Sequence, residues 1–122
     1  MPDFAFLLLH VADHDASAAF YGDLLGLPVV ERKDDFAALP LRGGAVLGLW
    51  RRETVEPESS GQAGAGEIAF AVADAAAVDA TYANWRARGV TILQVPTGMS
   101  FGRTFVATDP DGHRLRVFAP AA

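Results

Sequence analysis

The stretch Glu67–Asp74, with the sequence EIAFAVAD, repeats the pattern of Phe6–Asp13, with the sequence FLLLHVAD. In this register Asp13 falls on Asp74, and a helical pattern carrying aromatic residues follows each aspartate. The period of this repeat is about half the chain. It is too long for a solenoid, and two copies are too few for one. The sequence therefore predicts two similar modules that pack as one domain of 122 residues.

The bulk composition limits the class of protein and its partners. The chain is 51% hydrophobic and 20% charged, which is typical of an ordered globular domain. It has no cysteine, so disulfides and thiolate ligands are excluded, and a reducing cytoplasm is the expected location. The net charge of −5 argues against nucleic acid and against anionic membrane surfaces. The apolar run 4–9 is too short for a signal peptide, and nothing is long enough to cross a bilayer.

Hydrophobic patterning predicts the order β-α-β-β-β for the first module. The helix is expected over residues 16–25, with Asp13 or Asp15 as the N-cap and Gly26 in the left-handed position at its end. The strands are expected at residues 4–11, 28–33, 36–41 and 45–50. Pro40 lacks an N–H group, which restricts the third of these strands to a sheet edge or a bulge.

The second half repeats this order after a polar connector. We assign residues 1–51 to the first module, 52–66 to the connector and 67–122 to the second module. Here a helix is expected over 75–88, and the strands are expected at residues 67–73, 90–95, 103–108 and 113–118. The tetrad 109–112, with the sequence DPDG, predicts a tight turn between the last two strands.

Each predicted strand can bury one face under a helix and turn the other inward. The expected fold class is therefore α+β, with two βαβββ modules forming a curled eight-stranded mixed sheet around a cavity.

Several short motifs, in their order along the chain, resemble those of the vicinal oxygen chelate superfamily of glyoxalases, extradiol dioxygenases and bleomycin-resistance proteins. These motifs are Val11-Ala12-Asp13, residues 17–21, Leu25-Gly26-Leu27 and residues 109–112. Three further stretches look like the phenazine-antibiotic-resistance and related drug-binding branch: residues 47–50, 54–57 and 101–105.

The resemblance implies a test for a metal site. Metal-dependent members carry histidine or glutamate at four positions, which here hold Phe6, Gly48, Glu67 and Arg116. A catalytic divalent metal needs about three protein ligands, and only Glu67 could supply one. His10 lies four residues beyond the first of these positions. We therefore expect neither a metal nor any other cofactor.

The same inner positions predict a ligand-binding surface. Gly48 leaves space beside Trp50, whose indole would give a planar aromatic guest a flat wall, although Trp50 could instead be a core residue. Glu67 and Arg116 could form a structural ion pair, or Arg116 could hold a ligand carboxylate. The predicted ligand-binding residues are Phe6, Leu8, His10, Phe36, Gly48, Trp50, Glu67, Met99, Phe101, Phe105 and Arg116.

Three functions are compatible with these observations. The first is non-catalytic binding and sequestration of a planar aromatic, antibiotic-like small molecule by a homodimer, since superfamily members commonly pair modules between chains. The second is a metal-independent enzyme of the same fold, in which Glu67 acts as a general base. The third is a dimeric scaffold whose cavity is filled by its own side chains.

Overall fold

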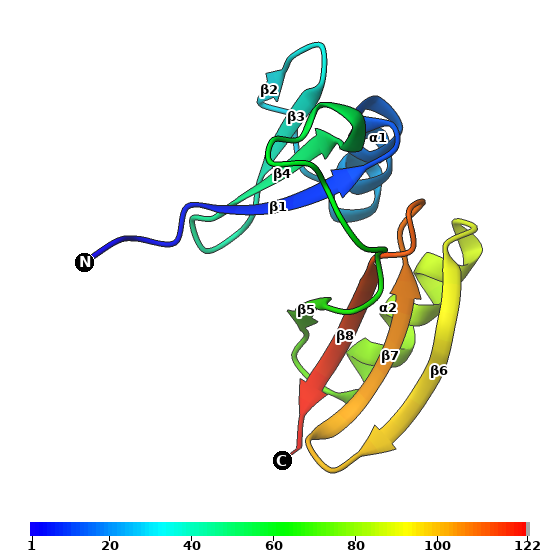
Figure 1. Cartoon of the computed structure of the whole chain (residues 1–122). Coiled ribbons are helices and arrows are strands. Elements are labelled where there is room, and N and C mark those ends of the chain that lie inside the picture. The colour runs from blue at the N-terminus through cyan, green and yellow to red at the C-terminus, as the bar shows by residue number, and fades with distance from the viewer. Residues whose placement is uncertain (122) are drawn as a thin grey trace. The chain divides into compact units, whose positions relative to one another are not determined.

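The computed structural model describes residues 1–121. These residues form two compact units, of which the first ends at Gly61 and the second begins at Gln62. Each unit holds one β-α-β-β-β module with its own four-stranded sheet (Figure 1). No helix within residues 1–121 has the length and apolar character of a membrane span.

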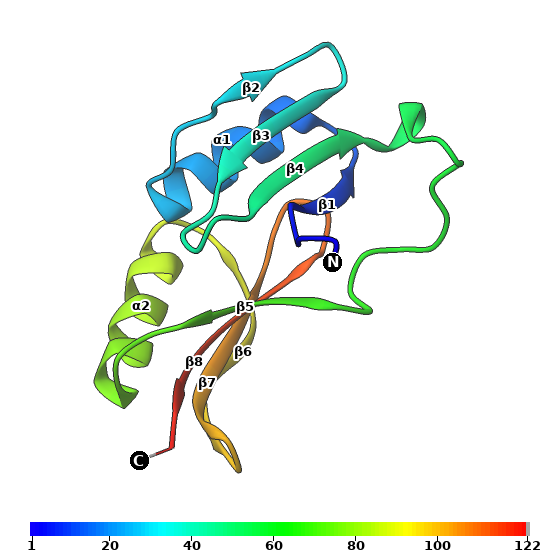
Figure 2. The same cartoon turned by 90° about the vertical axis from the view of Figure 1, so that its left-hand side faces the viewer.

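The first unit contains one α-helix and a mixed sheet in the order β1-β4-β3-β2. β1 runs parallel to β4, and the other neighbours are antiparallel. α1 packs on one face of this sheet (Figure 2). The elements are β1 (Phe6–Val11), α1 (His14–Leu25), β2 (Glu31–Arg32), β3 (Phe36–Pro40), β4 (Val46–Arg51) and a short 3-10 helix, η1 (Arg52–Thr54).

Strand alternation supplies the core of the first unit. Leu47 is opposite both Leu7 and Leu39, so the three side chains lie on one face of the sheet. Leu39, Leu47 and Leu49 are buried, as are Ala18 and Tyr21 of α1. The face that α1 covers is therefore mainly apolar, and the opposite face, here called the open face, carries the remaining strand residues.

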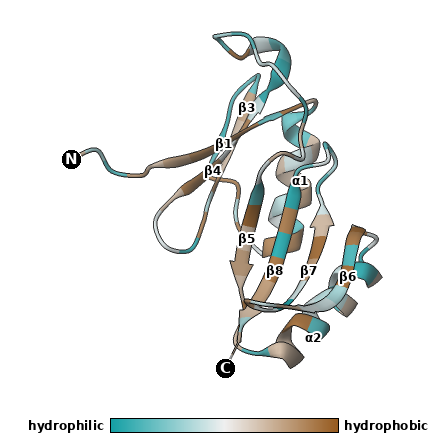
Figure 3. Ribbon diagram, turned by 60° about the horizontal axis from the view of Figure 1, so that its bottom comes forward, coloured by the Kyte–Doolittle hydropathy of each residue, from teal (hydrophilic) through white to brown (hydrophobic). Residues whose placement is uncertain are grey.

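The second unit repeats this plan with the sheet order β5-β8-β7-β6. β5 is parallel to β8, as β1 is to β4. Buried Val78 and Trp85 of α2 face Phe105, Leu115 and Val117 of the sheet. The elements are β5 (Glu67–Ala71), α2 (Ala75–Ala87), β6 (Thr91–Met99), β7 (Gly102–Thr108) and β8 (Arg114–Pro120). Hydrophilic and hydrophobic residues alternate from Arg114 to Val117 of β8 (Figure 3).

The local signals of the repeat are confirmed. Asp13 accepts hydrogen bonds from the N–H groups of Asp15 and Ala16, and Asp74 accepts one from Ala77, so each caps a helix. Gly26 ends α1 with a φ of 65°. At the last turn, the Asp109 carboxylate accepts bonds from the N–H groups of the residues two and four positions later.

The α+β class and the two βαβββ modules are confirmed, but several details of the prediction were wrong. In the described residues the eight strands pair only within two separate four-stranded sheets. β3 is an inner strand: Pro40 is tolerated because β2 pairs only with Ala37 and Ala38 and does not reach it. β6 continues to Met99, where a loop was expected, because its pairing with β7 resumes after two irregularities.

Candidate ligand-binding site

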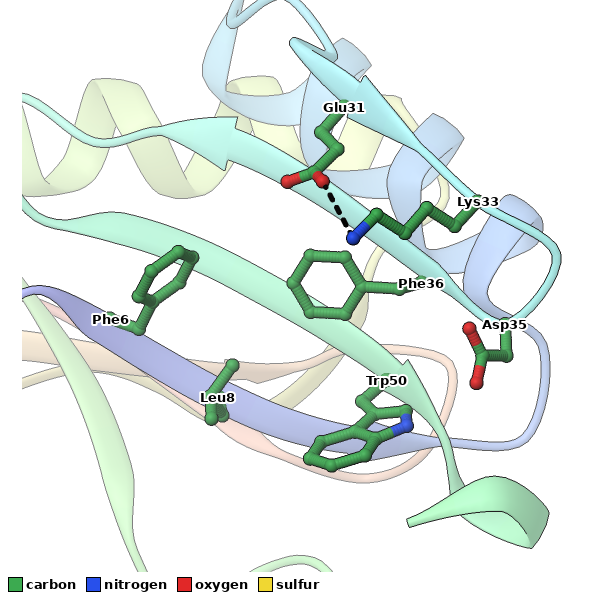
Figure 4. A pocket seen from close by; sticks show the side chains of 7 residues that line it. All are labelled: Phe6, Leu8, Glu31, Lys33, Asp35, Phe36 and Trp50. Atoms are coloured by element: carbon green, nitrogen blue, oxygen red, sulfur yellow. Dashed lines mark ion pairs between the residues drawn. The ribbon is translucent and has the colours of Figure 1, made fainter.

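A pocket of about 410 Å³ lies on the open face of the first sheet. Three rows of opposed residues cross this face: His10, Trp50 and Phe36; Leu8, Gly48 and Ala38; and Phe6, Val46 and Pro40. The pocket is lined by Phe6, Leu8, Glu31, Lys33, Asp35, Phe36 and Trp50 (Figure 4). Phe6 and Leu8 are each 45% exposed, so the pocket opens to solvent along β1.

Gly48 does not supply empty space for a guest, which corrects the prediction. A Cβ atom at this position would lie 2.6 Å from Cδ2 of Leu8 and 2.9 Å from Cζ of Phe36. These two side chains already close over the glycine from β1 and β3. The role of Gly48 is therefore to let Leu8 and Phe36, which both line the pocket, approach each other above it.

The indole of Trp50 is held in a fixed orientation by a short chain of hydrogen bonds. Its Nε1–H group donates to Oγ1 of Thr54 at 3.1 Å. The Thr54 hydroxyl in turn donates to Oδ2 of Asp35 at 2.7 Å. The carbonyl oxygen of Arg51 is a second acceptor, 3.1 Å from the same hydroxyl. On the other side, the ring of His10 meets the indole edge-on at 6.3 Å between centroids, and its Nδ1 pairs with Oγ of Ser59 at 2.6 Å.

The rim of the pocket is charged. Lys33 and Glu31 form an ion pair at 3.1 Å beside the ring of Phe36, and both side chains remain substantially exposed. Asp35 is half-buried next to the nitrogen edge of Trp50. The rim thus combines one neutralised pair with a carboxylate that accepts a hydrogen bond from a neutral hydroxyl.

Glu67 and Arg116 form an ion pair in the second unit, one of the two alternatives that the sequence offered. Nε and Nη2 of Arg116 donate to the two carboxylate oxygens of Glu67 at 2.8 and 3.0 Å, and Arg114 lies 3.7 Å from the same carboxylate. Hydrogen bonding to Arg116 lowers the pKa of Glu67, and the same bond raises the pKa of Arg116. Arg116 also donates to Oγ1 of Thr104 at 3.2 Å.

The three remaining predicted residues belong to the β6–β7 hairpin. Met99 ends β6 and Phe101 lies in the turn, and both are more than 40% exposed. The guanidinium of Arg116 lies 5.9 Å from the centre of the Phe101 ring, which makes a cation–π contact. Phe105 was wrongly assigned to the site: it is fully buried against Tyr82 and Trp85 on the face that α2 covers.

Comparison with known proteins identifies the family. Residues 4–117 match the model of the glyoxalase/bleomycin resistance protein/dioxygenase superfamily. The chain belongs to this superfamily. A phenazine antibiotic resistance protein from Enterobacter agglomerans is 28% identical over 117 residues, which are 90% of this chain and 86% of that relative.

Two solved structures of this superfamily fold extend the comparison. The solution structure of a protein from Agrobacterium tumefaciens is 49% identical, covers 100% of both chains and has a TM-score of 0.90. The crystal structure of a lactoylglutathione lyase from the same organism is 22% identical, covers 96% of this chain and 92% of that one, and has a TM-score of 0.78. The second likeness concerns the fold alone.

The residues at the superfamily's metal positions do not fit a metal ion. Phe6 and Gly48 have no side-chain atom that could bind a metal. At the other two positions, Arg116 donates two hydrogen bonds to the carboxylate of Glu67. A separate cluster of Asp109, Asp111 and His113 has its ligand atoms within 4.8 Å of one another. Since the carboxylate of Asp109 holds the turn through three hydrogen bonds, this cluster has a structural role.

Sequence reasoning missed four residues of the site. Glu31, Lys33 and Asp35 line the pocket, and Thr54 fixes the indole. The first three belong to the β2–β3 hairpin, and alternation from Glu31 to Lys33 would have placed these two side chains on one face. Thr54 begins one of the stretches that resemble the phenazine-resistance branch, but strand alternation could not place its side chain, because it belongs to the connector, whose beginning forms η1 in the first unit.

Proposed function

We propose that this protein binds a planar aromatic, antibiotic-like small molecule in the pocket of the first unit and sequesters it without converting it. The observation that carries the proposal is the arrangement of Phe6, Phe36 and Trp50 around a pocket of about 410 Å³. This volume falls within the range of about 300–1,000 Å³ typical of small-molecule sites.

The ring walls favour a flat guest. Trp50 and Phe36 are directly opposed on neighbouring strands, and Phe6 stands two rows away on the same face. A planar guest can stack on an aromatic side chain, which contributes about 0.5–1.5 kcal/mol beyond the burial of its area. The hydrogen bond to Thr54 fixes the indole before binding, so less rotamer entropy is lost on association.

The distant relative named for phenazine antibiotic resistance supports the same class of ligand. Phenazines are flat tricyclic aromatics, which suit a pocket with ring walls. At 28% identity the relative supports the class and not a particular compound.

The electrostatics of Glu67 favour binding over catalysis. A general base works best when its pKa lies near the operating pH. Hydrogen bonding to Arg116 moves the pKa of Glu67 away from neutral pH, below its ordinary value of 4.5. Glu67 is therefore a poor base near neutral pH, and the enzyme hypothesis gains no support from it.

Binding is tested by titrating the protein with phenazine and following tryptophan fluorescence. The chain has two tryptophans, so the variant Trp85→Phe leaves Trp50 as the single reporter. Saturable quenching of Trp50 is expected. Trp50→Ala, assayed by equilibrium dialysis, should bind about tenfold more weakly or worse because stacking and buried area are both lost. Unchanged affinity in a folded Trp50→Ala variant would remove this residue from the site.

Sequestration without conversion is tested by mass spectrometry of the recovered ligand. Phenazine incubated with excess protein should be recovered unchanged, and Glu67→Gln should leave its affinity unaltered. A converted product that disappears in Glu67→Gln would replace the proposal with the enzyme hypothesis.

A further inference from the structure

The charged rim of the pocket indicates which planar aromatics it accepts. Resting on the proposed function, we infer that the ligand carries a positive charge, as a ring cation or an attached amine, and that Asp35 is its counter-ion. The inference follows from the placement of Asp35, from the charge balance of the lining and from the nature of the ring walls.

Asp35 is fixed at one end of the pocket. Its Oδ2 atom accepts the 2.7 Å hydrogen bond from Thr54, which itself accepts the indole N–H of Trp50. The carboxylate therefore stands beside the nitrogen edge of the indole (Figure 4). A guest stacked on Trp50 would bring that end of its ring close to Asp35.

The lining has a net negative charge. Its charged side chains are Glu31, Lys33 and Asp35, two acids and one base, and Lys33 pairs with Glu31 at 3.1 Å. Within residues 1–121, Asp35 has no ion-pair partner of its own. One formal negative charge is thus left at the end occupied by Asp35.

The aromatic walls of the pocket also favour a cationic ligand. The faces of Trp50 and Phe36 carry the negative side of the aromatic quadrupole, which attracts cations. An anionic guest would meet these faces and Asp35 together. Its only attractive partner in the lining is Lys33, which would first have to leave Glu31.

The test compares three acridines that share one ring system: N-methylacridinium, neutral acridine and acridine carboxylate. Affinities are measured by equilibrium dialysis at low ionic strength, with acridine in its neutral form. Wild-type protein should bind the cation about tenfold more tightly than neutral acridine, because a charge pair at close range near a protein surface is worth at least that factor. The carboxylate should bind most weakly.

The decisive variant is Asp35→Asn, whose amide oxygen can still accept the hydrogen bond from Thr54. It should lose most of the preference for the cation, measured as the ratio of its affinities for N-methylacridinium and for neutral acridine. Asp34→Asn is the matched control, because it removes the same charge from the exposed neighbouring residue, which does not line the pocket. It should keep the preference.

Three outcomes would overturn the inference. Equal affinity of wild-type protein for the cation and neutral acridine would refute it and leave the proposed function standing. An equal loss of preference in Asp34→Asn and Asp35→Asn would assign the effect to the general field of an acidic protein. If none of the acridines binds, the proposed function fails as well.

Discussion

The open faces of the two sheets differ, although the two modules share one topology. In the first, the residues opposed across β1, β4 and β3 are mostly aromatic or aliphatic, and Trp50 and Phe36 line a pocket. In the second, the corresponding face carries Arg116, its partner Glu67 and the hydroxyl of Thr104. One backbone plan thus supports an aromatic surface in one copy and an ion-pair network in the other.

This difference shows how the modules divide stability from function. The face under the helix has a buried apolar centre in both units, because it must exclude water for the sheet and helix to pack. The open face has no such requirement and can change its chemistry without loss of the fold. Substitutions under the helices should therefore act on stability, and substitutions on the open faces on binding or on local electrostatics.

The largest effect on stability is expected in the β6–β7 hairpin, which carries one phenylalanine under α2 and another in its exposed turn. Phe105→Ala should lower the free energy of unfolding by about 3–5 kcal/mol, because it leaves a cavity beside Tyr82 and Trp85. The matched control is Phe101→Ala in the turn of the same hairpin, where the ring is 43% exposed, and it should cost far less. Chemical denaturation measures both. Similar losses would contradict the division between the two faces.

The two helix caps should differ by a smaller amount. Asp13→Ala should lower the free energy of unfolding by about 1 kcal/mol, and Asp74→Ala by somewhat less. The reason is that Asp13 accepts two backbone N–H bonds and Asp74 accepts one. Asp13→Asn and Asp74→Asn retain an acceptor and serve as controls. A larger loss in Asp74→Ala would break the proposed ranking.

Gly48→Ala should change binding more than stability. The added methyl group must displace Leu8 and Phe36, while the loss of glycine flexibility in a strand returns roughly 0.5–1 kcal/mol. The free energy of unfolding should therefore change by less than about 1 kcal/mol, and phenazine affinity should fall severalfold. Dialysis and denaturation on the same preparation separate the two effects. Intact affinity would show that Leu8 and Phe36 can move without harm to the pocket.

The smallest effect concerns the ion pair of the second open face. Because the pKa of Glu67 is lowered in the folded state, its contribution is present above the ordinary pKa of 4.5 and lost as pH falls through the folded-state value. Wild-type protein should thus exceed Glu67→Gln in stability at neutral pH, by less than about 1 kcal/mol. The gap should close in acid. Glu58→Gln, in the exposed connector, is the control and should show no such gap.

The sequence by itself determined the repeated module, its helix caps and its tight turns. The aligned Asp13 and Asp74, Gly26 at a helix end and the DPDG turn act through neighbouring backbone groups, so their roles follow from spacing alone. The ion pair of Glu67 with Arg116 was one of two alternatives, and it was expected because both residues stand where metal-dependent members of the superfamily carry metal ligands.

Only the tertiary structure decided which residues complete the site. Phe105 was misplaced because residues of both parities between Thr104 and Thr108 of β7 are apolar or small, and alternation then does not reveal which face receives the helix. The gap at Gly48 is filled by side chains from two other strands, Leu8 and Phe36. The fixed indole of Trp50 depends on Asp35, which lies distant along the chain. Such contacts depend on the packing of separate segments, and no local pattern in the sequence encodes them.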